Sequence, residues 1–356
     1  MKPFRALTAI EQLAAHLRGE IQAGALGETL PGVHRLAKEL GVSPKSVVAA
    51  VAQLEHEGLL RGQGPRRRCR IMPPGTRAAT GLRVVILLYE AGDRLLPYIH
   101  DLDHLLREAG HVVTFARKTM LELGRDVRRV AGFVERTEAD AWVVLGGPGE
   151  VLEWFATRPV AAFALFGRRS GIDIAGTGPD KQAALRKVVR RLLALGHRRI
   201  VLLVRRERRL PRPGGKERAF FNELEVHGTE LGSYHLPDWE ESIEGFHACL
   251  RNLLRFTPPT AFIVDEAPFF IAALQFCSRH GIRVPEDVSL VCCDDDPGFA
   301  WCQPAITHIR WDPRPMVRRI VNWAAKVSRG IDDRRQSETP AEFVEGGTIG
   351  PAAEEK

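Results

Sequence analysis

The chain has 356 residues and a mass of 39.6 kDa, a size that suggests two or three domains. Hydrophobic residues make up 44% of the chain and charged residues 27%, the balance of a globular protein and not of a disordered one. No apolar run approaches the roughly 20 residues that span a bilayer, and the six cysteines are scattered without CxxC pairs. These features argue against secretion, membrane insertion and a zinc module. We expect a cytoplasmic protein that contains no metal and no cofactor.

Positive charge is concentrated near the N-terminus. The whole chain has 51 Lys and Arg residues against 44 Asp and Glu residues, a net charge of +7. Residues 1–75 contain 11 basic and 6 acidic side chains, so they hold most of this excess. A basic balance at one end is typical of proteins that bind a polyanion, most commonly nucleic acid. A merely basic surface explains the charge equally well, so motifs must decide between the two interpretations.

Three helices are predicted in the first 60 residues. Apolar side chains recur at helical spacing over residues 8–23, and a second helix follows the turn at Pro31–Gly32. Ser43 is a good N-cap for a third helix, and Pro44 suits its first position because the missing N–H costs nothing there. This third helix is expected to bury one apolar face made of Val47, Val48, Val51 and Leu54.

A hairpin of two short strands is predicted to follow the third helix. The strands are joined around Gly64–Pro65, and Arg66, Arg67 and Arg68 lie at the tip. Three helices and such a hairpin make a winged helix-turn-helix. Guanidinium groups at the tip could lie along a phosphate backbone or enter a minor groove. Hairpin tips are often polar without binding anything, but the neighbouring helices favour contact with DNA.

The segment TLPGVHRLAKELGVSPKSVVAAVAQLEHEGLLRGQG resembles the GntR-type winged helix. In that family the position of Arg35 begins the second helix and contacts phosphate. Lys45, Ser46 and Val47 begin the family's recognition helix, and Ser43, its cap, is expected with Lys45 and Ser46 to contact DNA. The resemblance implies that residues 1–72 form a domain that binds double-stranded DNA.

A linker and then a larger domain are predicted after the hairpin. Residues 73–81 are rich in Pro, Gly and small polar residues, which is typical of a linker. From Leu82 onward, apolar strands alternate with helices, beginning with a strand at 82–89 and a helix at 97–109. This alternation indicates an α/β fold with parallel sheets covered by helices on both faces.

The α/β region, residues 82–350, is predicted to form two lobes. The N-lobe covers about 82–168 and the C-lobe about 175–308, with later segments crossing between them. A strand at 231–236 is expected within the C-lobe. Two such lobes enclose a cleft between the carboxyl ends of their strands, which is where α/β proteins bind ligands.

Residues 180–203 and 259–313 resemble the LacI/GalR repressors and the periplasmic binding proteins. The landmarks that carry the likeness are the sequences PTA, GIRVPEDVSLV, DDD and PAITHI. The resemblance runs from about residue 82 to residue 350. It implies a two-lobed effector-sensing domain that also dimerises, with a sugar or a sugar derivative as the effector.

The same resemblance implies a set of effector contacts. Asp294 matches the family's ligand-binding Asp, and a carboxylate at the carboxyl end of a strand can accept hydrogen bonds from two sugar hydroxyls. Glu266 falls where the family often has Asn, and Lys216 falls where it often has Arg. The ring of Trp311 could stack on a sugar face or pack between the lobes. Tyr89, at the end of the first strand, is expected at the rim of the cleft.

Other polar motifs are given structural interpretations. The basic run RRERRLPRPGGK, residues 205–216, could bind an anion, but a solvated loop between a strand and a helix is the simpler expectation. His100 and His104 have a helical metal-binding spacing without a third ligand. Gly146–Gly149 follows a strand but lacks the Lys and Ser/Thr of a P-loop, and is expected to be a turn facing the cleft.

These patterns favour a dimeric transcriptional regulator that binds a near-palindromic operator with an affinity controlled by a small molecule. One alternative is a sugar-processing enzyme with a DNA anchor, although no catalytic motif supports it. A second is a solute-binding transport protein, which the N-terminal DNA-binding domain argues against. A third is a regulator whose α/β region serves only for dimerisation.

Overall fold

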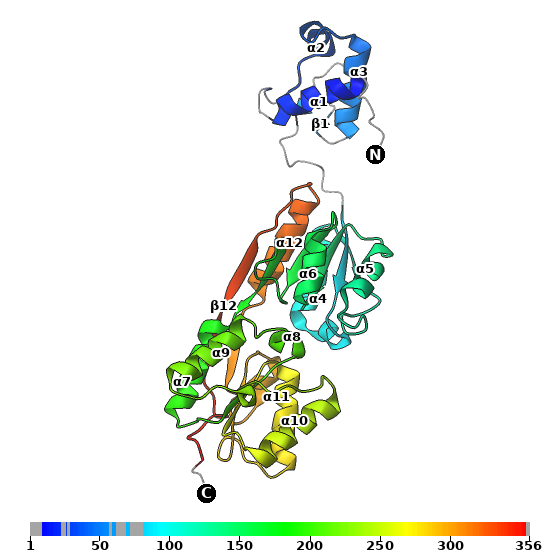
Figure 1. Ribbon diagram of the computed structural model, residues 1–356. Helices are drawn as coiled ribbons and strands as arrows, with labels where there is room; N and C mark the ends of the chain where they lie inside the picture. The colour runs from blue at the N-terminus through cyan, green and yellow to red at the C-terminus, as the bar shows by residue number, and fades with distance from the viewer. Residues whose placement is uncertain are drawn as a thin grey trace.

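The structure, a computed structural model, describes residues 9–22, 26, 29–56, 59–61, 69–71 and 81–353. A small helical domain stands at the N-terminus, and a larger α/β domain follows it (Figure 1). None of the described helices is long and apolar enough to cross a membrane.

The N-terminal domain is a winged helix-turn-helix. Its three helices are α1 (Ala9–Gln22), α2 (Val33–Glu39) and α3 (Pro44–His56). The base of the wing is an antiparallel pair of two-residue strands, β1 (Leu60–Arg61) and β2 (Arg70–Ile71). Both α1 and α2 pack on α3 around a common apolar core that includes Leu13, Leu17, Leu36, Val47, Val51 and Leu54. The fold predicted for this segment is therefore confirmed.

One residue of the predicted helical core lies outside it. Val48 is 54% exposed, whereas Val47 and Ala50 are completely buried. The first two helices cover the side of α3 that carries Val47, Ala50 and Leu54, and Val48 points away from that side. The apolar face of α3 is consequently narrower than its sequence suggests.

The α/β domain is built on strands in the order β4-β3-β5-β6-β7-β12-β11-β10-β9-β8. The first half of the sheet consists of parallel strands β3 (Arg83–Leu87), β4 (Val112–Phe115), β5 (Ala141–Leu145), β6 (Ala161–Leu165) and β7 (Ala175–Asp180). The second half consists of parallel strands β8 (Ile200–Leu203), β9 (Ala261–Val264), β10 (Ser289–Cys292) and β11 (His308–Trp311). Strand β12 (Gln336–Val344) joins the halves, because it pairs parallel with β7 and then antiparallel with β11.

Helices cover both faces of each half. The N-lobe helices are α4 (Pro97–Glu108), α5 (Val127–Glu135), α6 (Gly149–Ala156) and α12 (Arg314–Val327). The C-lobe helices are α7 (Gln182–Ala194), α8 (Arg206–Arg209), α9 (Gly215–Val226), α10 (Ile243–Phe256) and α11 (Ala267–Arg279). The 3-10 helices among the described residues are η1 (Ala91–Leu95), η2 (Ser233–His235) and η3 (Pro297–Trp301). Each lobe has an apolar core on both sides of its strands, as the predicted two-lobed α/β class requires.

Two details of the predicted organisation, the end of the N-lobe and the strand at 231–236, differ from the structure. The N-lobe extends to about residue 180, beyond the expected limit of 168, because β7 pairs with β6. Late in the chain, α12 returns to the N-lobe, where Trp323 joins the core beside α4. Residues 231–236 contain η2 in place of the predicted strand. There the ring Nδ1 of His235 bonds the carbonyl oxygen of Ile200 at 2.7 Å, which occupies part of the free edge of β8 that a strand would have used.

Candidate ligand cleft and nucleic-acid interface

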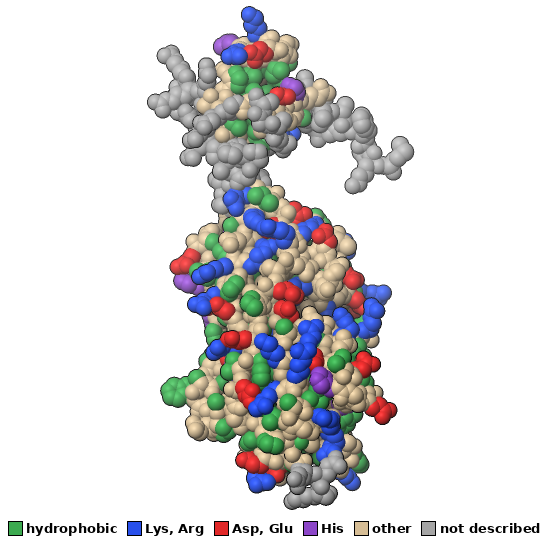
Figure 2. All heavy atoms as spheres, turned by 90° about the vertical axis from the view of Figure 1, so that its left-hand side faces the viewer, with side chains coloured by type: hydrophobic (Ala, Val, Ile, Leu, Met, Phe, Trp, Pro, Cys, Tyr) green, Lys and Arg blue, Asp and Glu red, His purple; other side chains and the backbone are tan. Residues whose placement is uncertain are grey.

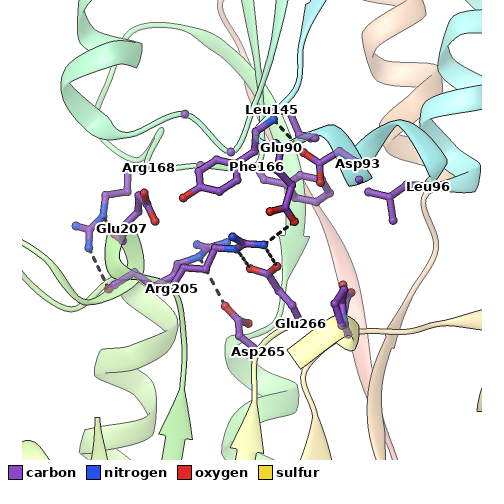
Figure 3. A pocket seen from close by; sticks show the side chains of 18 of the residues that line it. Glu90, Asp93, Leu96, Leu145, Phe166, Arg168, Arg205, Glu207, Asp265 and Glu266 are labelled. Atoms are coloured by element: carbon purple, nitrogen blue, oxygen red, sulfur yellow. Dashed lines mark hydrogen bonds and ion pairs between the residues drawn. The ribbon is translucent and has the colours of Figure 1, made fainter. Parts of the chain in front are cut away.

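A cavity of about 260 Å³ lies between the lobes at the carboxyl ends of the strands. Residues that follow β3, β5 and β6 form its N-lobe wall, and residues that follow β8, β9 and β10 form its C-lobe wall. Figure 3 shows charged side chains pointing into it from both sides. The cavity is slightly smaller than typical ligand pockets, which measure about 300–1,000 Å³.

Arg205 is the central charged group of the cavity (Figure 3). Its Nε and Nη2 atoms donate to the two carboxylate oxygens of Glu266 at 2.7 and 2.8 Å, a bidentate pair within the C-lobe. Nη2 also donates to Oε1 of Glu90, in the N-lobe, at 2.8 Å. Burial opposes the charge of Arg205, but Glu266 and Glu90 outweigh that effect and raise the pKa of the guanidinium. Arg205 therefore connects the two lobes as a permanent cation.

Local backbone structure holds Glu90 in position. Glu90 is the N-cap of η1, and the carboxylate of Asp93 accepts hydrogen bonds from the backbone N–H groups of Tyr89 and Glu90, both at 2.9 Å. Burial raises the pKa of Asp93. The turn after β3 thus fixes the backbone of Glu90 and places its carboxylate at the cleft.

A second polar group, the carboxylate of Asp294, lies at the carboxyl ends of β10 and β11. Oδ1 of Asp294 accepts from the indole N–H of Trp311 at 2.8 Å and from Nζ of Lys181 at 3.1 Å. The Trp311 ring packs edge-on against Tyr98 and Phe166 of the N-lobe, with centroid separations of 5.6 and 5.7 Å. These three aromatic residues give the cavity an apolar wall beside the carboxylate.

Two N-lobe arginines grip α8 from across the cleft. Nη1 of Arg125 lies 2.7 Å from Oε1 of Glu207 on α8 and 2.6 Å from Oε2 of Glu241. Arg168 donates to three backbone carbonyl oxygens, namely those of Glu207, of Arg208 at 3.0 Å and of Arg212 at 2.5 Å. We call these contacts of Arg125 and Arg168 the interlobe clasp. Together with Arg205, they connect the two lobes across the cleft.

A buried ion pair lies behind the C-lobe wall. Nζ of Lys216 pairs closely with Oδ1 of Asp265, and both side chains are less than 10% exposed. Burial would raise the pKa of Asp265, but Lys216 and Arg208 lower it to about 2. Asp265 lines the cavity, whereas Lys216 lies behind it and does not.

The predicted effector contacts can now be placed. Asp294, Glu266, Trp311 and Tyr89 all line the cavity, which brings together residues that are up to 222 positions apart in the sequence. Lys216 instead reaches the cavity only through Asp265. Trp311 fits both interpretations of its role, since it lines the cavity and packs between the lobes.

The sequence did not predict that the arginines after β8 are buried or that Arg205 and Arg208 line the cavity. The run 205–216 was expected to be a solvated loop, but Arg205 is 11% exposed and Arg209 is buried. Arg209 donates to backbone carbonyl oxygens of Pro237 and Trp239 and pins α8 to the C-lobe. The density of arginines directly after a strand was the available signal, because the carboxyl ends of strands face the cleft.

In the N-terminal domain, the predicted DNA-binding side chains lie on the surface around α2 and α3. Arg35 is 70% exposed and its Nε donates to Glu39 at 2.7 Å. Ser43 caps α3, since its Oγ accepts from the backbone N–H of Ser46 at 3.1 Å, and Lys45 is exposed. Arg66, Arg67 and Arg68, like linker residues 73–80, lie outside the described residues.

The surface of the α/β domain carries charges of both signs. On the face shown in Figure 2, Lys and Arg side chains are interspersed with Asp and Glu side chains. Among the described residues of this domain, Arg310 pairs with Glu342 at 2.7 Å, and Arg191 pairs with Glu345 at 2.8 Å. The basic excess of the chain therefore gives this face no unbroken cationic surface.

Comparison with protein families identifies both domains. Residues 9–68 match the bacterial regulatory proteins of the gntR family, and residues 189–349 match the periplasmic binding protein-like domain. The chain is 33% identical over 146 residues to an uncharacterized HTH-type transcriptional regulator in the aml 5′ region of Streptomyces limosus, an alignment that covers 40% of this chain and 41% of the relative. It is 27% identical over 146 residues to the lactose operon repressor of Escherichia coli, covering 40% and 39% of the two chains. The chain thus spans about two fifths of the length of these curated relatives.

Solved structures share the fold. The complex of the transcriptional regulator CelR with cellobiose aligns over 90% of this chain and 100% of its own, with a TM-score of 0.62 and 19% identity. The lac repressor dimer bound to operator and the anti-inducer ONPF aligns over 77% of this chain and 96% of its own, with a TM-score of 0.60 and 17% identity. The chain therefore contains a segment that matches the gntR family of bacterial regulatory proteins and a later segment that matches the periplasmic binding protein-like domain, and it shares the fold of solved LacI-family regulators.

Proposed function

We propose that this protein is a transcriptional regulator that binds double-stranded DNA through its N-terminal domain and a small effector through the interlobe cleft. The observation that carries the proposal is the presence of both parts in one chain: a winged helix-turn-helix and a two-lobed domain with a ligand-sized cavity between the lobes. The relatives are named as regulators and repressors, which supports a regulatory and non-enzymatic role. Such a protein acts in the cytoplasm, where the DNA is.

The exposed side of α3 suits contact with a DNA groove. Lys45 and Val48 lie one turn apart and both are exposed, with Val48 at 54%. An ammonium group can pair with phosphate or with a guanine edge, and an apolar side chain can contact a thymine methyl. Arg35 adds a second exposed cation in the first turn of α2.

The effector is proposed to be polyhydroxylated, as a sugar is. Asp294 offers a carboxylate acceptor, and Trp311, Tyr98 and Phe166 offer apolar faces beside it. A structural neighbour was solved with cellobiose, which supports the same class of ligand. The effector is proposed to contact both lobes, so its binding would favour one arrangement of the lobes over another. In a dimer, that shift would change the spacing between the two DNA-binding domains.

The working unit is proposed to be a homodimer, in keeping with a two-fold operator. Trp301 on η3 is 92% exposed and Ile271 on α11 is 53% exposed. Their elements pack together, since the rings of Phe299 and Phe270 lie 5.5 Å apart. Exposed Trp and Ile side chains on two elements that pack together are the kind of residues that interface cores contain. Trp301→Asp should convert a dimer into a monomer in analytical ultracentrifugation.

The function is tested by selecting DNA with the full chain and measuring its affinity by fluorescence anisotropy. A regulator of this kind is expected to enrich a near-palindromic sequence and to bind it at least a thousandfold more tightly than random DNA. Failure to enrich any sequence, with a folded and dimeric protein, would refute the proposal.

A further inference from the structure

The guanidinium of Arg208, on α8, lines the cavity, and it donates no hydrogen bond to another group of the described residues. Its Nε lies 3.9 Å from Oδ2 of Asp265, which is an ion pair but is too long for a hydrogen bond. The Arg208 side chain is 39% exposed. Because a guanidinium has five N–H donors and no acceptor, these donors remain available to an acceptor in the cavity.

Other cations hold the carboxylates around Arg208. Nζ of Lys216 pairs closely with Oδ1 of Asp265. Both carboxylate oxygens of Glu266 accept from Arg205, toward which Glu266 points in Figure 3. Burial opposes the charge of Arg208, but Asp265 outweighs that effect and raises the pKa of the guanidinium. Arg208 is therefore a cation that is attracted to this wall without being bound tightly to it.

The backbone of Arg208 takes part in the interlobe clasp. Its carbonyl oxygen accepts from Nη2 of Arg168, in the N-lobe, at 3.0 Å. The same oxygen accepts from the backbone N–H of Gly214 at 3.0 Å. A ligand that binds the side chain of Arg208 would therefore act on a residue through which the N-lobe holds α8. Such a contact would connect occupancy of the cavity to the arrangement of the lobes.

We propose that Arg208, and not Lys216, is the cation that binds the effector. The guanidinium donates to hydroxyl and ring oxygens of the sugar, and Asp294 accepts from a hydroxyl of the same ligand. Lys216 is a positioning residue, because its ammonium group holds Asp265 behind the cavity and keeps that carboxylate from pairing closely with Arg208. This inference rests on the proposed function, because it concerns the effector of the same cleft.

The test is titration calorimetry of the full chain with D-glucose, D-galactose and cellobiose. At least one of these sugars is expected to bind. Arg208→Gln should weaken its binding at least tenfold, as the loss of a charge-assisted hydrogen bond does. Arg208→Lys should weaken it by less, because the charge is kept and only the planar set of donors is lost. Arg206→Gln changes an exposed arginine of the same helix, so this matched control should bind the sugar as the wild type does.

Thermal unfolding without sugar separates binding from stability. The Arg208 side chain donates no hydrogen bond within the described residues, so Arg208→Gln should shift the unfolding midpoint by less than about 2 °C. Lys216→Met leaves the buried carboxylate of Asp265 without its cation. This variant should therefore lower the midpoint more than Arg208→Gln does, while weakening sugar binding less.

Three results would overturn the inference: wild-type sugar affinity in Arg208→Gln, absence of binding by all three sugars, and a greater loss of affinity in a folded Lys216→Met variant than in Arg208→Gln. The proposed function has a separate readout, the selected DNA. A chain that enriches a near-palindromic DNA but keeps its sugar affinity in Arg208→Gln would remain a regulator without this contact. A chain that enriches no DNA would remove the regulator, whatever sugar it binds.

Discussion

Removal of Arg125 should open the cleft. Its guanidinium is the N-lobe partner of Glu207 and Glu241, whose side chains are only 14% and 10% exposed. In Arg125→Ala, both poorly solvated carboxylates lose their cation, and losing one partner of a buried charged pair costs about 2–5 kcal/mol. Arg125 is itself 27% exposed, so water can restore part of the solvation and about 2 kcal/mol is the expected net cost.

This cost falls on one arrangement of the lobes. The contacts of Arg125 with the C-lobe exist only while the lobes are closed, so the open arrangement loses nothing when they are removed. A shift of about 2 kcal/mol changes the ratio of open to closed protein by about 30-fold. The closed arrangement keeps Arg168 and Arg205, so the variant should populate both arrangements instead of losing one entirely.

Pulsed electron paramagnetic resonance can measure the change. Spin labels at the exposed positions Glu153 on α6 and Arg251 on α10 report the separation of the lobes, in a background with Cys69 and Cys302 replaced by Ser. Arg125→Ala should add a population at longer distance. Arg128→Ala removes an exposed arginine of the same segment and should give the wild-type distribution. A wild-type distribution in Arg125→Ala as well would refute the role assigned to the interlobe clasp.

Three further predictions concern DNA, effector and stability. Replacing Arg66, Arg67 and Arg68 together with Ala should weaken binding to every DNA sequence. The slope of log affinity against log salt concentration should become shallower by about 0.9 per lost phosphate contact. An unchanged slope in anisotropy titrations would argue against a contact between the wing and DNA. Asp294→Ala should weaken effector binding by one to two decades in calorimetry, because a charge-assisted hydrogen bond contributes about 1.5–3 kcal/mol. Asp294→Asn should weaken it by less. If the Ala variant binds the effector with wild-type affinity, Asp294 only shapes the turn. Because the pKa of Asp265 is lowered to about 2, its ionisation stabilises the fold above pH ~4, and this contribution disappears as the pH falls through about 2. Urea unfolding should therefore show Asp265→Asn to be less stable than wild type by about 2–3 kcal/mol at pH 6 and by progressively less below pH 4, while a pH-independent difference would contradict the assignment.

Local patterns made most of the fold predictable. The spacing of apolar residues over α1 and α3, the Ser43 cap and the uninterrupted apolar strands are properties of adjacent residues, and the structure has helices and strands at those places. The register at which neighbouring helices cover α3 is not local, and for that reason Val48 was wrongly assigned to the core.

The cleft was harder to predict because its partners are far apart in the sequence. Arg205 is 61 residues from Glu266 and 115 from Glu90, and no periodicity connects them. Composition alone predicts that an arginine-rich run lies on the surface, and only its position directly after β8 indicated that it lies at the cleft. Lys216 was predicted to contact the effector, but it lies behind the cavity wall and pairs with the buried Asp265, a partner that could not be foreseen from spacing.

The central claim is that one chain couples DNA affinity to occupancy of the interlobe cleft. The most direct measurement is the anisotropy of a selected DNA duplex titrated with the full chain, with and without a sugar that calorimetry has shown to bind. We predict that the sugar changes the DNA affinity of the wild-type protein at least fivefold, a typical allosteric coupling, and leaves Asp294→Ala unaffected at the same sugar concentration. Identical DNA affinity with and without a sugar that saturates the cleft would contradict the coupling.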